Sequence, residues 1–181
     1  NVTIENNLVV NNKDDADSPA QTFSWGKSAL TPIGLNEADN VRIFNNTVWD
    51  NDSATIIAEG VTNAVVKNNI FQRFQVANNS TATSDYNLSP SFETTSGGVM
   101  IKGGHDLNGS PTFAYSNNGS DLNSANWNYR LASNSLGIDT GTNTSGVSGY
   151  SVPAFDKEGK NRVDISAVLN GSAGFYDIGA Y

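Results

Sequence analysis

The stretch "NVTIENNLVV", Asn1 to Val10, recurs twice, as "NVRIFNNTVW" (Asn40 to Trp49) and "NAVVKNNIFQ" (Asn63 to Gln72). The three copies share Asn at the first place, apolar residues at the second and fourth, Asn-Asn at the sixth and seventh, and an apolar residue at the ninth. Apolar residues two apart lie on one face of a strand. Each copy therefore predicts a strand, a corner and a second short strand.

The Asn-Asn pair interrupts the alternation at the place where the corner is expected. Asn tolerates the left-handed backbone conformation of a tight corner, and its amide can bond to backbone groups there. We therefore expect Asn7, Asn46 and Asn69 to stack at one corner of the fold, as structural residues and not as ligands.

The second and third copies begin at Asn40 and Asn63, 23 residues apart. Apolar pairs before them, Ile33 with Leu35 and Ile56 with Ala58, add a third strand to each turn. Three strands and three corners in this length are typical of one turn of a parallel β-helix, in which each coil buries its apolar face only by stacking on its neighbours. A two-sheet sandwich is the rival fold, but it does not explain the recurrence.

The length and composition predict one folded domain with an acidic net charge. It has 181 residues, a net charge of -8, 15% charged residues and no cysteine. The acidic charge argues against nucleic-acid binding, and the absence of cysteine excludes disulfides. No membrane span is present. Asn-x-Ser/Thr triplets are abundant and permit glycosylation.

We predict an all-β fold, a right-handed parallel β-helix (solenoid) with an irregular C-terminal cap. Residues 1–113 hold the coils, regular to near residue 75 and irregular after it, with a flank insertion at 13–32. Residues 114–181 form a capping segment of the same domain. Because the first residue already lies inside a repeat, we expect the chain to be a trimmed part of a longer protein.

The second half carries a more particular pattern. The segments follow one another as "SDYNL" (Ser84 to Leu88), "GSPTF" (Gly109 to Phe113), "NYRLASNSLGIDTGT" (Asn128 to Thr142), "FDKEGKNR" (Phe155 to Arg162) and "YDIGAY" (Tyr176 to Tyr181). With the repeats, this order resembles bacterial extracellular right-handed β-helix proteins, which are pectate-lyase-like and carry a choice-of-anchor type C-terminal region. The resemblance implies secretion and display at the cell surface.

Two classes of function follow from the resemblance and the residues. The first is a carbohydrate-directed protein that binds a polysaccharide or glycan, or is the downstream part of a lyase or uronate epimerase. The second is a non-catalytic structural protein, a stalk, adhesin or filament subunit that self-associates through its β-helix ends and carries glycans. The absence of a catalytic set favours a non-enzymatic role for these residues.

Arg42 and Lys67 are the weak catalytic candidates and the first substrate-binding candidates. They occupy outward places of neighbouring repeats and should lie diagonally on one face, which suits an acidic sugar. Alternatively, they are ordinary solubilising residues that pair with Glu5 or Glu59.

The insertion offers two further candidates. Asp14, Asp15 and Asp17 are oxygen donors for Ca²⁺, although a solvated acidic loop is the favoured interpretation and no cofactor is required. Trp25 and Lys27, with Trp49 on the next coil, could stack on and bind a sugar, or the loop Trp could cover a core edge.

The remaining polar residues fall near the end of the chain. His105 is the only histidine, lies in a Gly-flanked turn and is a poor catalytic candidate without a well-placed carboxylate. The terminal motifs supply a structural set that we expect to tie the last segment to the solenoid through an Arg-carboxylate network: Asp139, Asp156, Arg162 and Asp177.

Overall fold

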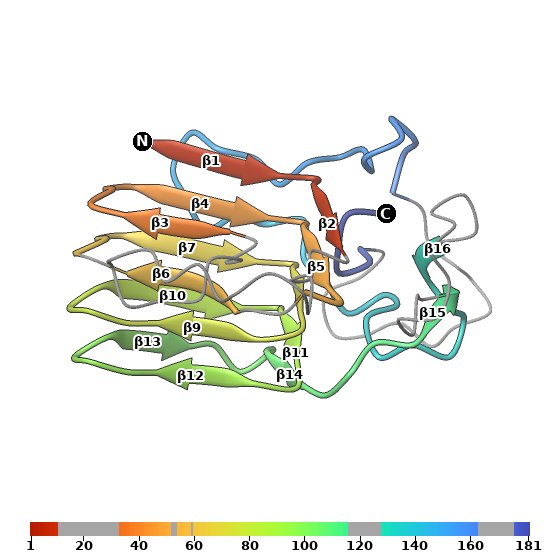
Figure 1. Ribbon diagram of the computed structural model, residues 1–181. Helices are drawn as coiled ribbons and strands as arrows, with labels where there is room; N and C mark the ends of the chain where they lie inside the picture. Colours follow the sequence, from red (N-terminus) through yellow and green to blue (C-terminus); the bar gives the residue numbers. More distant parts are fainter. Residues whose placement is uncertain (11–32, 52–53, 59, 116–127, 163–175) are drawn as a thin grey trace, which may run out of the picture.

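The structure is a computed structural model that describes residues 1–10, 33–51, 54–58, 60–115, 128–162 and 176–181. These residues form strands and turns, and they contain no helix. Most strands belong to three parallel sheets that are stacked as a β-solenoid (Figure 1). The predicted parallel β-helix is therefore confirmed and the sandwich is wrong, because sandwich sheets pair antiparallel strands. The hand of the coil stays a prediction.

Each sheet collects one strand from every coil. Sheet A contains β1 (Val2–Glu5), β4 (Val41–Phe44), β7 (Ala64–Lys67), β10 (Thr81–Asp85) and β13 (Val99–Lys102). Sheet B contains β2 (Leu8–Val10), β5 (Thr47–Trp49), β8 (Ile70–Phe71), β11 (Leu88–Ser89) and β14 (Leu107–Asn108). Sheet C contains β3 (Gly34–Asn36), β6 (Thr55–Ala58), β9 (Phe74–Val76) and β12 (Phe92–Thr94).

The regular coils extend further than the sequence analysis expects. Strands β10 to β14 follow residue 75 and continue all three sheets with parallel pairing. The expectation of irregular strand segments there is wrong. The last coils are shorter than the earlier ones, so their strands do not recur at the spacing of the repeat. Equivalent corner residues are 23 apart between the second and third coils, but 18 and 19 apart in the next two steps.

The core lies inside the coils and matches the alternation in the repeats. Val41 and Ile43 of β4 are fully buried, as are Val66 of β7 and Phe71 of β8. They pack with the inward side chains of sheet C, including Ile57 and Phe74. The second and fourth places of each repeat thus point into the solenoid, and the third and fifth point outward.

An amide ladder runs along the corner between sheets A and B. The backbone N–H of Asn7 donates to Oδ1 of Asn46 at 3.0 Å, and that of Asn46 donates to Oδ1 of Asn69 at 2.9 Å. The ladder continues from Asn69 to Asn87 and from Asn87 to Asp106, each at 2.9 Å. The side chains of Asn46, Asn69 and Asn87 also donate to carbonyls of the coil above. Such fully bonded buried amides fix the register of the coils.

The first residue of each corner adopts the conformation that the sequence predicts. Asn6, Asn45 and Asn68 have φ of 55°, 54° and 57°. Tyr86 occupies the same place in the next coil with φ of 59°, which is uncommon for a bulky residue.

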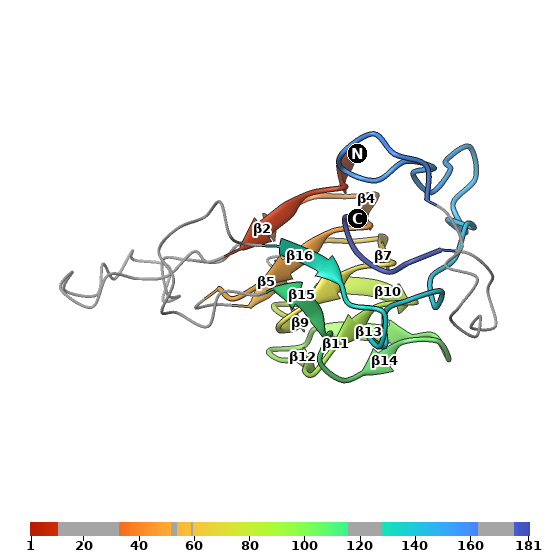
Figure 2. The same ribbon diagram turned by 90° about the vertical axis from the view of Figure 1, so that its right-hand side faces the viewer.

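The chain leaves the solenoid through an antiparallel pair, β15 (Phe113–Tyr115) and β16 (Asn128–Leu131). The segment after β16 runs along the outer faces of sheets A and B (Figure 2). On sheet B, Ile178 packs with Ile70 and Leu88 in a second apolar cluster. The approach is close, since a Cβ at Gly179 would lie 2.7 Å from Oγ1 of Thr47. That this segment closes an end of the solenoid stays a prediction.

Candidate functional site

The outer face of sheet A is covered by the C-terminal segment at β1 and β4, which form the upper part of the sheet in Figure 1. The ring of Tyr150 stacks on Phe44 with centroids 5.2 Å apart, and its hydroxyl donates to Glu5. The guanidinium of Arg42 lies 5.3 Å from the same ring. Burial, with the Glu5 carboxylate, raises the pKa of Tyr150, so the phenol is neutral at ordinary pH.

Arg42 lines a cavity of about 270 Å³ beside this cover. The cavity lies between sheet A, at Asn40 and Asn63, and the turn at Gly146 and Ser148. The Nε atom of Arg42 is buried and has no hydrogen-bond partner in the described part of the chain. A guanidinium in a small polar cavity can bind a carboxylate that enters it.

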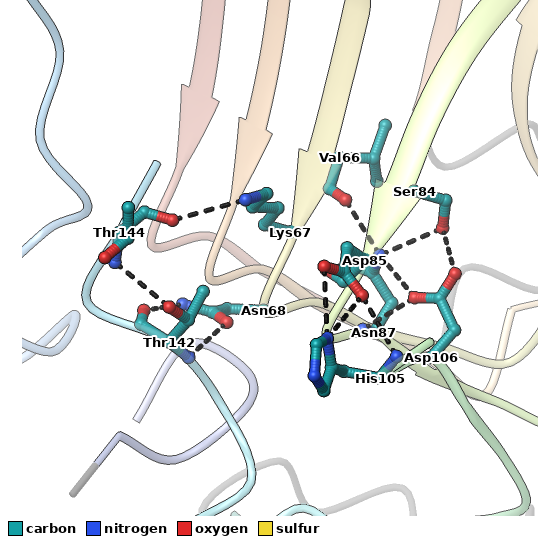
Figure 3. A network of polar contacts seen from close by, with 10 residues as sticks. All are labelled: Val66, Lys67, Asn68, Ser84, Asp85, Asn87, His105, Asp106, Thr142 and Thr144. Atoms are coloured by element: carbon teal, nitrogen blue, oxygen red, sulfur yellow. Dashed lines mark hydrogen bonds and ion pairs between the residues drawn. The ribbon is translucent and has the colours of Figure 1, made fainter. Parts of the chain in front are cut away.

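Lys67 marks the lower boundary of the covering segment. Its amino group donates to the carbonyl of Thr144 at 3.3 Å, and Asn68 next to it exchanges two hydrogen bonds with the backbone of Thr142 (Figure 3). Lys67 pairs in register with Phe44, and Arg42 with Val65, so the two cations lie diagonally on one face. Neither cation forms an ion pair among the described residues, and Glu5 is bonded to Tyr150.

Below Lys67, three side chains form a cluster that the sequence analysis missed. Asp85 pairs in register with Lys67, and its Oδ1 accepts hydrogen bonds at 3.1 Å from the backbone N–H and from Nδ1 of His105 (Figure 3). The imidazole stacks on the ring of Tyr86, with centroids 4.2 Å apart and planes at 7°. The Lys67 amino group lies 5.9 Å from the centre of that ring.

The side chains of this cluster differ in their exposure to solvent. The imidazole of His105 is 45% exposed, whereas the Asp85 carboxylate is 19% exposed. Nδ1 is bonded to the carboxylate, and Nε2 makes no hydrogen bond among the described residues. Burial and the Asp85 charge raise the pKa of Tyr86, so the ring stays an uncharged platform. Gly103 makes room for the arrangement, because a Cβ there would lie 2.1 Å from Cγ of Asp85.

The cluster has a signal in the sequence. "DYNLS" (Asp85 to Ser89) and "HDLN" (His105 to Asn108) fit the corner and short-strand places of the repeat, with Asn87 and Asp106 at the ladder position. The shortened steps and the replacement of Asn-Asn by Tyr-Asn and His-Asp hide the match. Recognising it places Asp85, Tyr86 and His105 on adjacent coils.

Of the other predicted binding and metal residues, only Arg42 and Trp49 are described by the structure. Asp14, Asp15, Asp17, Trp25 and Lys27 lie outside the described residues. Trp49 is half-buried and packs edge-on against Phe113 at 5.7 Å, so this ring contacts the C-terminal pair β15–β16. Among the described residues, no group of three or more His, Cys, Asp or Glu side chains could hold a metal ion.

The predicted structural set surrounds the end of the chain. The Arg162 guanidinium donates to the carbonyls of Tyr181 at 2.8 Å and Gly179 at 3.0 Å, and to Oδ1 of Asn6 at 2.9 Å. Burial lowers its pKa to about 10, while the charges of Asp156 and Asp177 act in the opposite direction. The group is thus charged at neutral pH and bridges the C-terminal segment to the first coil.

The carboxylates of this set bond to the backbone nearby. Oδ1 of Asp156 accepts from the N–H groups of Glu158 and Lys160 at 2.8 and 2.9 Å, which fixes a turn. Oδ1 of Asp177 accepts from the N–H of Asp139 at 2.8 Å, which joins two parts of the segment.

Comparison with protein-family models, with curated proteins and with solved structures gives no match for this chain. In the described residues, no helix has the length and apolar character needed to cross a membrane.

Proposed function

We propose that the protein is a carbohydrate-directed protein of the bacterial cell surface or extracellular space, and that it binds an acidic glycan on the outer face of sheet A. The observation that carries the proposal is the cluster of Lys67, Tyr86 and His105. It places a cation on β7, which forms no ion pair among the described residues, beside two stacked rings at the corners of the next two coils. The resemblance of the repeats to extracellular pectate-lyase-like proteins supports the same proposal.

The chemistry of the cluster suits a uronate. The Lys67 ammonium can neutralise a sugar carboxylate, and the outer face of the imidazole offers a flat surface for the apolar side of a pyranose ring. The chain has a net charge of -8, so an anion needs a local cation to overcome the general repulsion. Arg42 offers a second such cation one coil above, in the cavity beside Tyr150.

The binding test uses oligouronates of pectate and alginate, with uncharged oligosaccharides for comparison, in calorimetric titrations of the whole chain. We expect Lys67→Gln to weaken uronate binding about tenfold, since one well-placed charge contributes on the order of 1 to 2 kcal/mol. Lys160→Gln is the matched control. It removes the same positive charge, but from an exposed lysine that forms an ion pair with Glu158. Equal loss in both variants, or no binding of any uronate, would contradict the proposal.

The Asp85–His105 pair favours a second candidate, eliminative cleavage of the bound uronate. In such a reaction Nε2 would take the proton from the carbon α to the carboxylate, and the electron pair of that C–H bond would form a carbon–carbon double bond. The C–O bond to the neighbouring sugar would break, and the leaving oxygen would take a proton from water. Ultraviolet absorbance of unsaturated uronates, with and without Ca²⁺, measures this directly. Absorbance that rises with the native chain and is lost in both His105→Ala and Lys67→Ala supports cleavage, whereas a silent assay leaves binding as the function.

A further inference from the structure

The two ends of the solenoid differ in a way that assigns a role to one of them. We propose that the upper end, formed by β1, β2 and β3, binds a further polypeptide coil with the same Asn-cornered repeat. The coil would add parallel strands to β1, β2 and β3, which are edge strands in the described part of the chain, and would extend the amide ladder. The inference does not depend on the proposed binding of glycans.

The ladder has a direction, and it is unfinished at the upper end. Each corner N–H donates to the side-chain oxygen of the next coil below, from Asn7 down to Asp106. The acceptor that this pattern provides on Asn7 is its own Oδ1, which accepts no hydrogen bond in the described part of the chain. Among the described residues, the Nδ2 of Asn7 also lacks the bond to a carbonyl of a preceding coil that Asn46 makes to Ile4.

At the lower end, formed by β12, β13 and β14, two charged side chains end the ladder and the inward column. Asp106 closes the ladder with a carboxylate that accepts from Asn87 and from Ser84 Oγ, but it has no amide to donate. On the edge strand β13, Lys102 occupies the inward column of Ser84, and its amino group lies 4.1 Å from the centre of the Phe92 ring. An inward cation on an edge strand prevents further pairing.

The inward column of the upper end is apolar. Ile4 precedes Ile43 and Val66 in the same column that Lys102 ends. Val2 and Ile4 pack against the core but are only partly buried, whereas Val41 and Ile43 one coil below are fully buried. An added coil would bury Val2 and Ile4 as fully as their counterparts, and this burial favours its binding.

A coil of the same type fits this end better than a second copy of the chain. The lower end of a copy would bring Lys102 over Ile4 and bury its charge against an apolar column. Two upper ends facing each other would present one Asn7 acceptor to another. A parallel coil instead supplies a corner N–H, apolar inward residues and strands that can pair with β1, β2 and β3.

The test extends the whole chain at Asn1 with a copy of residues 40–62, which is one coil long. Native Thr62 precedes Asn63, the first place of a repeat, so the copy joins to Asn1 with the same junction. We expect the extended chain to unfold at a higher denaturant concentration, and the amides of β1 to exchange with solvent at least about tenfold more slowly.

Two variants of the extended chain make the result specific. Ile43→Lys within the copy places a cation in the inward column, as Lys102 does below, and should remove the gain. Asn7→Ala removes the ladder acceptor and should remove part of the gain, while it changes the unextended chain little.

The outcomes decide the proposal. A higher midpoint with protected β1 amides, lost in the Ile43→Lys copy, supports it. An unchanged midpoint with fast β1 exchange overturns it, as does an equal gain from the Ile43→Lys copy. Sedimentation of the unextended chain gives the remaining result, because a concentration-dependent dimer that the extension abolishes would make a second copy the occupant and overturn the inference.

Discussion

The solenoid and the C-terminal segment are held by different means. Inside the solenoid, the coils from Asn7 to Asn87 repeat the same parallel pairing and corner amide, so each of these interactions has a counterpart one coil away. The C-terminal segment has little regular structure and depends on single side chains, such as Arg162, Tyr150 and Asn68. Repetition makes the first region tolerant of a local change at its edge, whereas the second depends on each contact.

The largest expected effect on stability comes from removing a ladder residue in the middle of the solenoid. Asn69→Ala takes away the acceptor of the Asn46 N–H and the donor to the carbonyls of Ile43 and Lys67, in a fully buried place. Leaving these groups unsatisfied should lower the free energy of unfolding by about 3 kcal/mol or more. Equilibrium denaturation in urea measures the change.

The matched control for this prediction is Asn7→Ala at the upper end. Asn7 makes fewer bonds and is only partly buried, so the expected loss is about 1 kcal/mol or less. Equal losses at the two positions would mean that the ladder does not gain its strength from burial between coils.

A change at Arg162 tests the other side of the comparison. Arg162→Met keeps much of the length of the side chain but removes the donors to Gly179, Tyr181 and Asn6. We expect a loss of about 2 kcal/mol from the unpaired carbonyls, and faster proteolysis of the C-terminal segment than of the coils.

Lys157→Met serves as the control, because the Lys157 amino group lies over the Tyr181 ring at 4.4 Å and its loss removes only that contact. Limited proteolysis followed by mass spectrometry separates the two variants. If Arg162→Met unfolds the solenoid and the segment together, the two regions form one cooperative unit and the distinction drawn here fails.

The sequence predicts the first region better than the second for a physical reason. Strand pairing repeated in each coil leaves a pattern in residues such as Ile4, Ile43 and Val66, and the corner conformation favours Asn. The packing of Tyr150 on Phe44 joins residues more than a hundred positions apart and has no period to mark it.

The candidate site falls between these cases. Its cation, Lys67, follows from the repeat and is predicted from its outward place. Its partners, Asp85, Tyr86 and His105, occupy repeat positions with altered residue types and shortened steps, so the pattern alone does not indicate them.

The smallest expected effect is at the lower end of the solenoid, where Asp106 takes the corner place that Asn occupies in the other coils. Burial raises the pKa of Asp106 despite three hydrogen bonds and the nearby charge of Lys102, which act in the opposite direction. An acid whose pKa is raised in the folded state contributes stability below its unfolded pKa and loses it as the pH rises through the folded pKa. Asp106→Asn removes that loss and restores the residue of the repeat, so we expect about 1 kcal/mol of added stability at neutral pH and little change near pH 4. Urea denaturation across this range measures the difference.

A variant that is less stable than the native chain at neutral pH would contradict this prediction. It would show that the carboxylate, which accepts from Ser84 and Asn87, ends the ladder better than the amide of the repeat does.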